Sequence, residues 1–160
     1  MARARGLGRG RGGVDLEPFE AFRSADETTD RFRAWTGNSA LDGVAFRVFG
    51  QGGTGGYAAF WLVRPGREPA DQPVVFLGSE GETGVVARDL GAFLWLPAAG
   101  SGPMEAAAPY EPDQVPHPNR ELTAIAEQFA PGTCASATVV TEQAAREFPD
   151  FDDAIMKLCR

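Results

Sequence analysis

The sequence predicts an α+β fold in which a mainly antiparallel sheet meander is flanked by helices. Helical patterns occupy the first part of the chain, strand patterns fill the middle, and helical patterns return after residue 89. The connections between the predicted strands are too short for helical crossovers, so consecutive strands are expected to pair antiparallel.

Two helical segments are expected before residue 40. Asp15 is expected to cap a short turn whose apolar side chains are Leu16, Phe19 and Phe22. Ser24 and Glu27 have the Ser-x-x-Glu spacing of a capping box, which predicts a helix that stops at Gly37. One side of that helix carries Thr28, Phe32 and Trp35.

The middle of the chain has the patterns of strands and tight turns. Val44, Phe46 and Val48 alternate with other residues, as in a strand with one buried face. Residues 57–63 and 74–77 are apolar throughout, as in interior strands, and residues 84–87 form a short returning strand. The glycine-rich residues 50–56 and the segment 78–82 are expected to be turns.

Helices are expected again in the last part of the chain. Asp89 opens one that Pro97 should end near Leu96, and residues 100–118 are expected to be irregular. Asn119 is expected to cap a helix with Leu122, Ile125 and Phe129 on its inner stripe. A further helix starts at Thr141 and ends before Pro149. Asp150 caps a last helix, whose inward side chains are Phe151, Ile155 and Leu158. Asp152 and Asp153 at its start suit the helix dipole.

Charge is unevenly distributed along the 160 residues. The whole chain carries −7, but residues 1–13 contain four arginines and no acid, which leaves −11 for residues 14–160. We expect residues 1–13 to be a disordered Arg/Gly-rich tail, or to precede a natural start at Val14, and residues 14–160 to be a single domain. The acidic body disfavours nucleic acid as a partner.

The compartment predicted from the sequence is the cytoplasm. Apolar stretches fall short of the ~20 residues that a membrane helix needs, and the basic amino terminus has no apolar run after it. Cys134 and Cys159 are therefore expected to be reduced thiols rather than a disulfide.

The patterns that resemble catalytic or cofactor motifs are incomplete. Residues 50–56 lack the lysine and the following helix of a phosphate-binding loop. Ser79 lacks the glycine two positions earlier that a nucleophile elbow needs, and the imidazole available to it is His117. One histidine and two distant cysteines do not make a zinc site. We expect no catalytic residues, no cofactor and no metal.

Glu80 and Glu82 are the best candidate carboxylate pair. At positions i and i+2 of a hairpin turn they can share a face, as paired acid and base groups do. Solvated turn carboxylates are the commoner outcome, and the same pair suits contact with a basic partner. Trp61 and Trp95 are expected in the core because their neighbours are apolar.

Residues 44–95 resemble bacterial members of the SUKH superfamily, which includes the Smi/Knr-type cell-wall regulators of yeast. The resemblance is carried by a strand ending at Gly50, an aromatic strand from Tyr57, a Val-rich strand with the acidic turn 78–82, a strand ending at Ala87, and a helix with Phe93 and Leu94. It implies an α+β domain without catalytic activity. Many bacterial members resemble immunity proteins that neutralise toxins, often nucleases. This chain departs from the pattern at Pro97 and after Gly100.

The resulting expectation is a non-enzymatic protein-binding domain, an immunity protein that neutralises a cognate bacterial toxin such as a nuclease. Glu80 and Glu82 are its expected partner contacts, and its partner is a basic toxin domain rather than a membrane or nucleic acid. Two alternatives stay open. One is a regulatory scaffold without a toxin partner. The other is a small hydrolase or ligand-binding protein that uses Ser79, Glu80 or His117.

Overall fold

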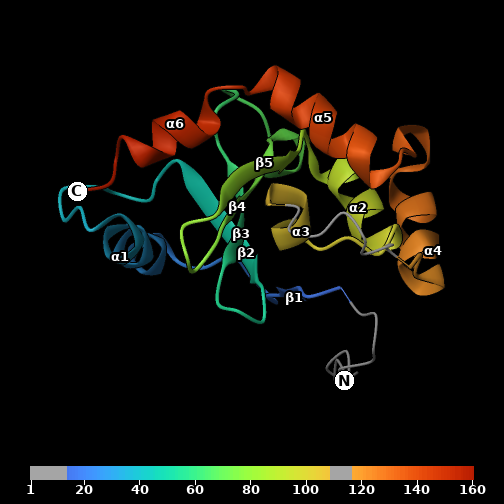
Figure 1. Ribbon diagram of the computed structural model, residues 1–160, viewed down its shortest axis with the longest axis horizontal. Helices are drawn as coiled ribbons and strands as arrows, with labels where there is room; N and C mark the ends of the chain where they lie inside the picture. Colours follow the sequence, from blue (N-terminus) through green and yellow to red (C-terminus); the bar gives the residue numbers. More distant parts are fainter. Residues whose placement is uncertain (1–13, 109–116) are drawn as a thin grey trace.

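An antiparallel sheet lies at the centre of the computed structural model, which describes residues 14–108 and 117–160 (Figure 1). Within those residues the sheet has five strands in chain order, each paired with the next. They are β1 (Glu17–Pro18), β2 (Phe46–Gln51), β3 (Tyr57–Trp61), β4 (Val74–Leu77) and β5 (Thr83–Ala87). The α+β prediction and the antiparallel meander are confirmed. The predictions for residues 1–13 and 109–116 lie outside the described residues.

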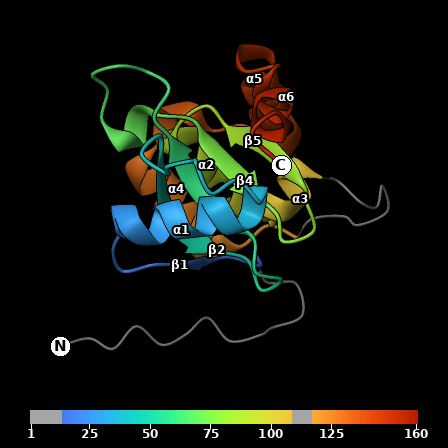
Figure 2. The same cartoon turned by 90° about the vertical axis from the view of Figure 1, so that its left-hand side faces the viewer.

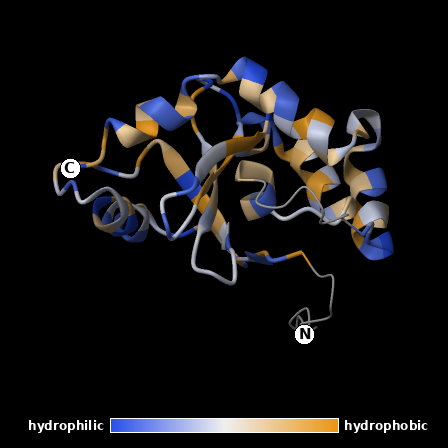
Figure 3. Cartoon of the chain, in the orientation of Figure 1, coloured by the Kyte–Doolittle hydropathy of each residue, from blue (hydrophilic) through white to orange (hydrophobic). Residues whose placement is uncertain are grey.

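Helices cover both faces of the sheet. On one face, α2 (Leu90–Ala98), α4 (Arg120–Phe129) and α5 (Ala137–Glu147) join a core centred on Phe60, Phe76 and Leu96. On the other, α1 (Ala25–Thr36) and α6 (Phe151–Met156) join a core with Phe46, Val75 and Leu77. Figure 2 shows α1 in the foreground of the strands. In Figure 3 the sheet and α2 carry much of the hydrophobic colour, whereas α1 is mostly hydrophilic.

Burial along the strands follows from this two-sided cover. All of β4 is buried, because it lies between β3 and β5 with helices on each face. In β2 burial alternates, as the sequence predicts, but the strand starts at Phe46 and Val44 is 60% exposed. Similarly, β3 ends at Trp61 rather than at residue 63.

The capping box of α1 is confirmed. The Glu27 N–H donates to Ser24 Oγ at 3.1 Å, and the Ser24 N–H donates to Glu27 Oε2 at 2.9 Å. Gly37 ends the helix with φ of 66°. Thr28 and Phe32 are buried as expected, and Trp35 is partly buried.

The chain beyond α6 returns to the end of α1. The Asn38 side chain donates from Nδ2 to the Leu158 carbonyl at 3.0 Å, and the Arg160 N–H donates to the Thr36 carbonyl at 2.9 Å. Phe32 of α1 lies in the same core as Phe151 of α6. The second face of the sheet is therefore closed by two segments more than 110 positions apart.

The helical turn predicted after Asp15 is wrong. Glu17 and Pro18 pair with β2, and the Phe19 and Arg23 N–H groups donate to the Phe49 and Val48 carbonyls at 2.7 and 3.1 Å. The segment thus bonds to the edge of β2 instead of to its own turn, and proline is tolerated on such an edge strand. Phe22 is 47% exposed rather than inward.

Two predictions about residues 97–107 are also corrected. Pro97 does not end α2, which runs to Ala98, because the Ala99 and Ser101 N–H groups donate to the Leu96 carbonyl at 3.1 and 3.0 Å and complete the last turn. The region expected to be irregular contains the short helix α3 (Pro103–Ala107). Short 3₁₀ turns also occur at η1 (Pro69–Asp71) and η2 (Pro131–Thr133).

The inner stripe predicted for α4 is right at Leu122, which packs against the core, but wrong at its other two positions; Asn119 caps the helix as expected. Ile125 and Phe129 are 42% and 69% exposed, whereas Ala126 is fully buried. Its small side chain allows a close approach to α2, and the Thr123 hydroxyl donates to the Ala98 carbonyl at 3.4 Å. Close packing through small residues therefore overrides the apolar stripe at Ile125 and Phe129.

The last two helices lie in the regions that the sequence predicts, but the details of their first residues differ from the prediction. Helix α5 begins at Ala137, capped by Ser136, rather than at Thr141, and it ends before Pro149 as predicted. Helix α6 begins after Asp150, but that side chain makes no capping hydrogen bond. No helix in the described part of the chain is long and apolar enough to cross a membrane.

Candidate partner-binding surface

The turn that carries Glu80 and Glu82 closes on itself. The Gly78 N–H donates to the Glu82 carbonyl at 2.6 Å, and Gly81 takes the left-handed φ of 96°. The Glu82 carboxylate folds back and accepts from the Glu80 N–H at 3.2 Å. Glu82 is consequently half-buried against its own turn, whereas the Glu80 side chain is exposed to solvent.

Helix α1 fixes this turn from one side. Trp35 donates from Nε1 to the Gly78 carbonyl at 2.7 Å, across 43 positions of sequence. A side chain at residue 78 would collide with the Glu82 carboxylate, so Gly78 allows this fold-back of Glu82. The position of the two glutamates thus depends on packing as well as on the hairpin.

The glycine-rich turn 52–56 lies beside it and brings further carboxylates (Figure 1). A Cβ built on Gly55 would lie 3.9 Å from Ser79 Cβ. Asp15 Oδ1 accepts from the Gly53 N–H at 2.8 Å, and Glu17 Oε2 accepts from Gln51 Nε2 at 3.3 Å. Neither acid was a candidate from the sequence, because both contacts depend on the pairing of β1 with β2.

Helix α6 adds one more acid next to the same turn. The Thr83 hydroxyl, one residue after Glu82, donates to Asp152 Oδ1 at 2.6 Å. In the sequence, the favourable interaction of an acid with the helix dipole accounts for Asp152. No local pattern indicates its contact with Thr83. We call the resulting set the acidic end of the sheet; it comprises Asp15, Glu17, Glu80, Glu82 and Asp152.

The carboxylates of the acidic end are not neutralised internally. Within residues 14–108 and 117–160, the ion pairs are Arg23–Glu27, Arg64–Glu147, Arg88–Asp89 and Arg146–Glu142, and none involves the acidic end. Arg31 lies on the Tyr57 ring, 4.7 Å from its centroid, and donates to the Tyr57 hydroxyl. Among the described residues, the carboxylates of the acidic end are therefore not held in ion pairs.

The residues considered for hydrolysis are not brought together. Ser79 and Glu80 are exposed in the turn, whereas the exposed His117 packs its main chain against Gly100 after α2. No hydrogen bond among the described residues joins Ser79, Glu80 and His117 to one another. Likewise, no group of three His, Cys, Asp or Glu side chains in the described part could hold a metal ion.

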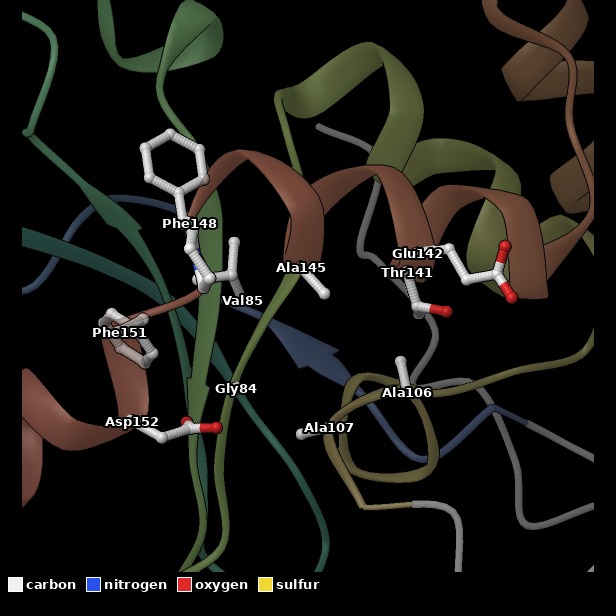
Figure 4. Close-up of a pocket in the computed structure, with 11 residues that line it drawn as sticks. Gly84, Val85, Ala106, Ala107, Thr141, Glu142, Ala145, Phe148, Phe151 and Asp152 are labelled. Atoms are coloured by element: carbon white, nitrogen blue, oxygen red, sulfur yellow. The ribbon is translucent and has the colours of Figure 1, made fainter.

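Two hollows on the described part of the surface are distinct from Ser79, Glu80 and His117. One, of about 260 Å³, opens along β5 between α3, α5 and α6 (Figure 4). The other, of about 360 Å³, has three arginines and three acids around it, and Arg64 spans it by bonding to Glu147 and to the Arg88 carbonyl. Neither hollow is lined by Ser79, Glu80 or His117.

The tryptophans differ in their roles. Trp95 is 7% exposed, as expected for the core, and donates to the Ala130 carbonyl at 2.9 Å. Trp61 is only partly buried and packs on Phe148 and Phe151, with ring centroids 5.5 and 4.9 Å away. Cys134 and Cys159 are free thiols.

Comparison with protein-family models, with curated proteins and with solved structures finds no match to this chain. The likeness to the SUKH superfamily therefore rests on its motif residues alone.

Proposed function

We propose that this chain is a non-enzymatic protein-binding domain that acts as an immunity protein, binding and neutralising a cognate bacterial toxin in the cytoplasm. Its partner is a basic toxin domain, with a nuclease as the leading class. The observation that carries the proposal is the acidic end, where carboxylates from β1, the turn before β5 and α6 lie along one end of the sheet and none is in an ion pair among the described residues.

Charge complementarity gives the physical basis of the proposal. A nuclease must attract phosphate and so presents a basic surface around its active site. A cluster of carboxylates on a rigid turn increases the association rate with such a surface and occupies the site that phosphate would take. The net charge of −11 over residues 14–160 acts in the same direction, and the SUKH resemblance implies the same role.

The experiment uses the product of the gene next to the one for this chain, if it contains a toxin domain. The domain is expressed in a bacterial host with and without this protein, and growth of the host is measured. The Kd between the purified toxin domain and this protein is measured by calorimetry. We expect the protein to restore growth. Glu80→Lys with Glu82→Lys should weaken binding by about tenfold or more, because rim charges that face a basic partner are reversed.

A matched control separates a local contact from a general charge effect. Glu121→Lys with Glu127→Lys makes the same charge change on exposed positions of α4 and should leave Kd within about twofold. Failure of the wild-type protein to bind or protect would overturn the proposal. Equal weakening by both double variants would remove the acidic end as the contact surface.

A further inference from the structure

The hollow along β5 lies at an edge of the sheet. Strand β5 is last in the strand order, and the chain passes around it, with α5 on one face of the sheet and α6 on the other. Gly84 and Val85 form one wall of the hollow, and Ala107 of α3 and Ala145 of α5 face it from the other side (Figure 4). We call it the β5 groove.

The walls of the β5 groove are about equally polar and apolar, and both of its charged residues are acids. Phe148 and Phe151 supply apolar surface, while Asp152 and Glu142 lie on opposite sides of the opening (Figure 4). No lysine or arginine lines it. Asp152 keeps Oδ2 free, since Thr83 bonds to Oδ1, and Glu142 has only a solvent-exposed pair with Arg146 at 3.7 Å.

The volume of the β5 groove limits the size of the group that can bind in it. About 260 Å³ is below the ~300–1,000 Å³ of small-molecule pockets, but it has room for a single apolar side chain. An apolar side chain alone would not use the two carboxylates, whereas a cation on each side of it would add an ion pair to Asp152 and to the solvent-exposed Glu142. Asp152 also belongs to the acidic end, so the groove continues that surface.

From this geometry we infer that the β5 groove binds a short extended segment of the partner protein that carries an apolar residue with a lysine or arginine two positions before it and another two positions after it, so that all three side chains lie on one face. The apolar side chain enters between Gly84 and Ala145, and the flanking cations pair with Asp152 and Glu142. The inference rests on the proposed function, since it names the part of the basic partner that anchors the complex.

The test uses a synthetic peptide as the probe. Amide shifts of the ¹⁵N-labelled full chain are followed during titration with acetyl-Lys-Gly-Val-Gly-Lys-amide up to about millimolar concentrations, the range expected for so short a ligand. We expect saturable shifts at Gly84, Val85 and Ala145. The acidic analogue with Glu in place of Lys should produce none.

Paired variants separate the apolar and the charged parts of the groove. Ala145→Leu fills the groove from an exposed helical position and should abolish the shifts, whereas Gln143→Leu, on the same helix outside the groove, should not. Glu142→Gln with Asp152→Asn keeps the shape and should remove the preference for the basic peptide. Equal binding of both peptides to the wild-type chain, shifts elsewhere, or no shifts would overturn the inference.

The toxin-domain experiment distinguishes the two proposals. If Ala145→Leu leaves the Kd for the toxin domain unchanged while the acidic-end variant weakens it, the groove is not an anchor but the proposed function stands. If the peptide binds as described but no toxin domain does, the groove stands and the proposed function fails.

Discussion

Gln72 holds together the connection between β3 and β4. It is 1% exposed, yet each polar atom of its amide has a partner. Nε2 donates to the Arg64 and Arg67 carbonyls at 2.7 and 3.2 Å, and Oε1 accepts from the Arg64 N–H at 2.8 Å. A buried amide bonded in this way replaces the backbone pairing that an irregular loop lacks.

We expect Gln72→Leu to lower the free energy of unfolding by about 1–3 kcal/mol, because it leaves main-chain groups of Arg64 and Arg67 without partners. Urea unfolding monitored by circular dichroism measures the change. Gln143→Leu, at an exposed site on α5, should stay within about 0.5 kcal/mol of wild type. Equal midpoints for the two variants would contradict this role of Gln72.

The indoles of Trp35 and Trp95 each donate one hydrogen bond to a main-chain carbonyl. Trp35→Phe and Trp95→Phe each remove one bond to a carbonyl, of Gly78 and Ala130 respectively, and each should cost about 0.5–1.5 kcal/mol. Only Trp35→Phe should shift the amide resonances of residues 78–82 and weaken partner binding. Unchanged resonances there would show that α1 does not position the acidic turn.

The candidate site was predictable only where its residues are local in sequence. Glu80 and Glu82 share one turn, so their proximity follows from the hairpin alone. Asp15 and Asp152 were interpreted as helix-capping and helix-dipole acids, because these roles depend on near neighbours. Their observed partners, Gly53 and Thr83, lie 38 and 69 positions away. Such pairings depend on tertiary packing rather than on local preference.

At the scale of elements, Glu27 at the start of α1 has both a structural and an electrostatic role. Hydrogen bonds from the Ser24 backbone and side chain, together with the charges of Arg23 and Arg31, lower the pKa of Glu27 below its ordinary value of 4.5. The lowered pKa means that the folded chain favours the ionised carboxylate. Its stabilisation is present above pH 4.5 and is lost as pH falls through the folded-state pKa.

Glu27→Gln should therefore destabilise the protein at pH 7 and have a smaller effect at pH 3, where the wild-type carboxyl is protonated too. Urea unfolding of both proteins at the two pH values provides the measurement. Glu121→Gln, in the first turn of α4, is a control outside the capping box. A difference between wild type and Glu27→Gln that is the same at both pH values would contradict the electrostatic role.

The strands were more predictable than the helices that pack on them. Apolar runs such as Val74–Leu77 need cover on both faces, so sequence alone determines both their type and their burial. Two of the three positions predicted for the α4 stripe are wrong, because Ala126 rather than Ile125 or Phe129 contacts the core beside Leu122. Which side of an amphipathic helix faces inward depends on the shape of its neighbour, here α2, and periodicity does not encode that shape.

At the scale of the whole molecule, charge separates into a basic amino-terminal stretch and an acidic body. We expect the association rate with a basic toxin domain to fall steeply as NaCl rises from about 50 to 300 mM, because screening shortens the range of the acidic field. Stopped-flow mixing measures this dependence. Glu80→Lys with Glu82→Lys should flatten it; a salt-independent rate for the wild-type protein would contradict electrostatic steering.

The pairing of α1 with α6 has a consequence for how the protein is made. A ribosome releases Phe32 long before Phe151 and Ile155, so the nascent α1 can stack Phe32 on Phe46 of the sheet but lacks the α6 side chains that complete this core. The opposite face needs nothing later in the chain than α5 and can be assembled earlier. We therefore expect the core between the sheet, α1 and α6 to be completed after the core on the opposite face.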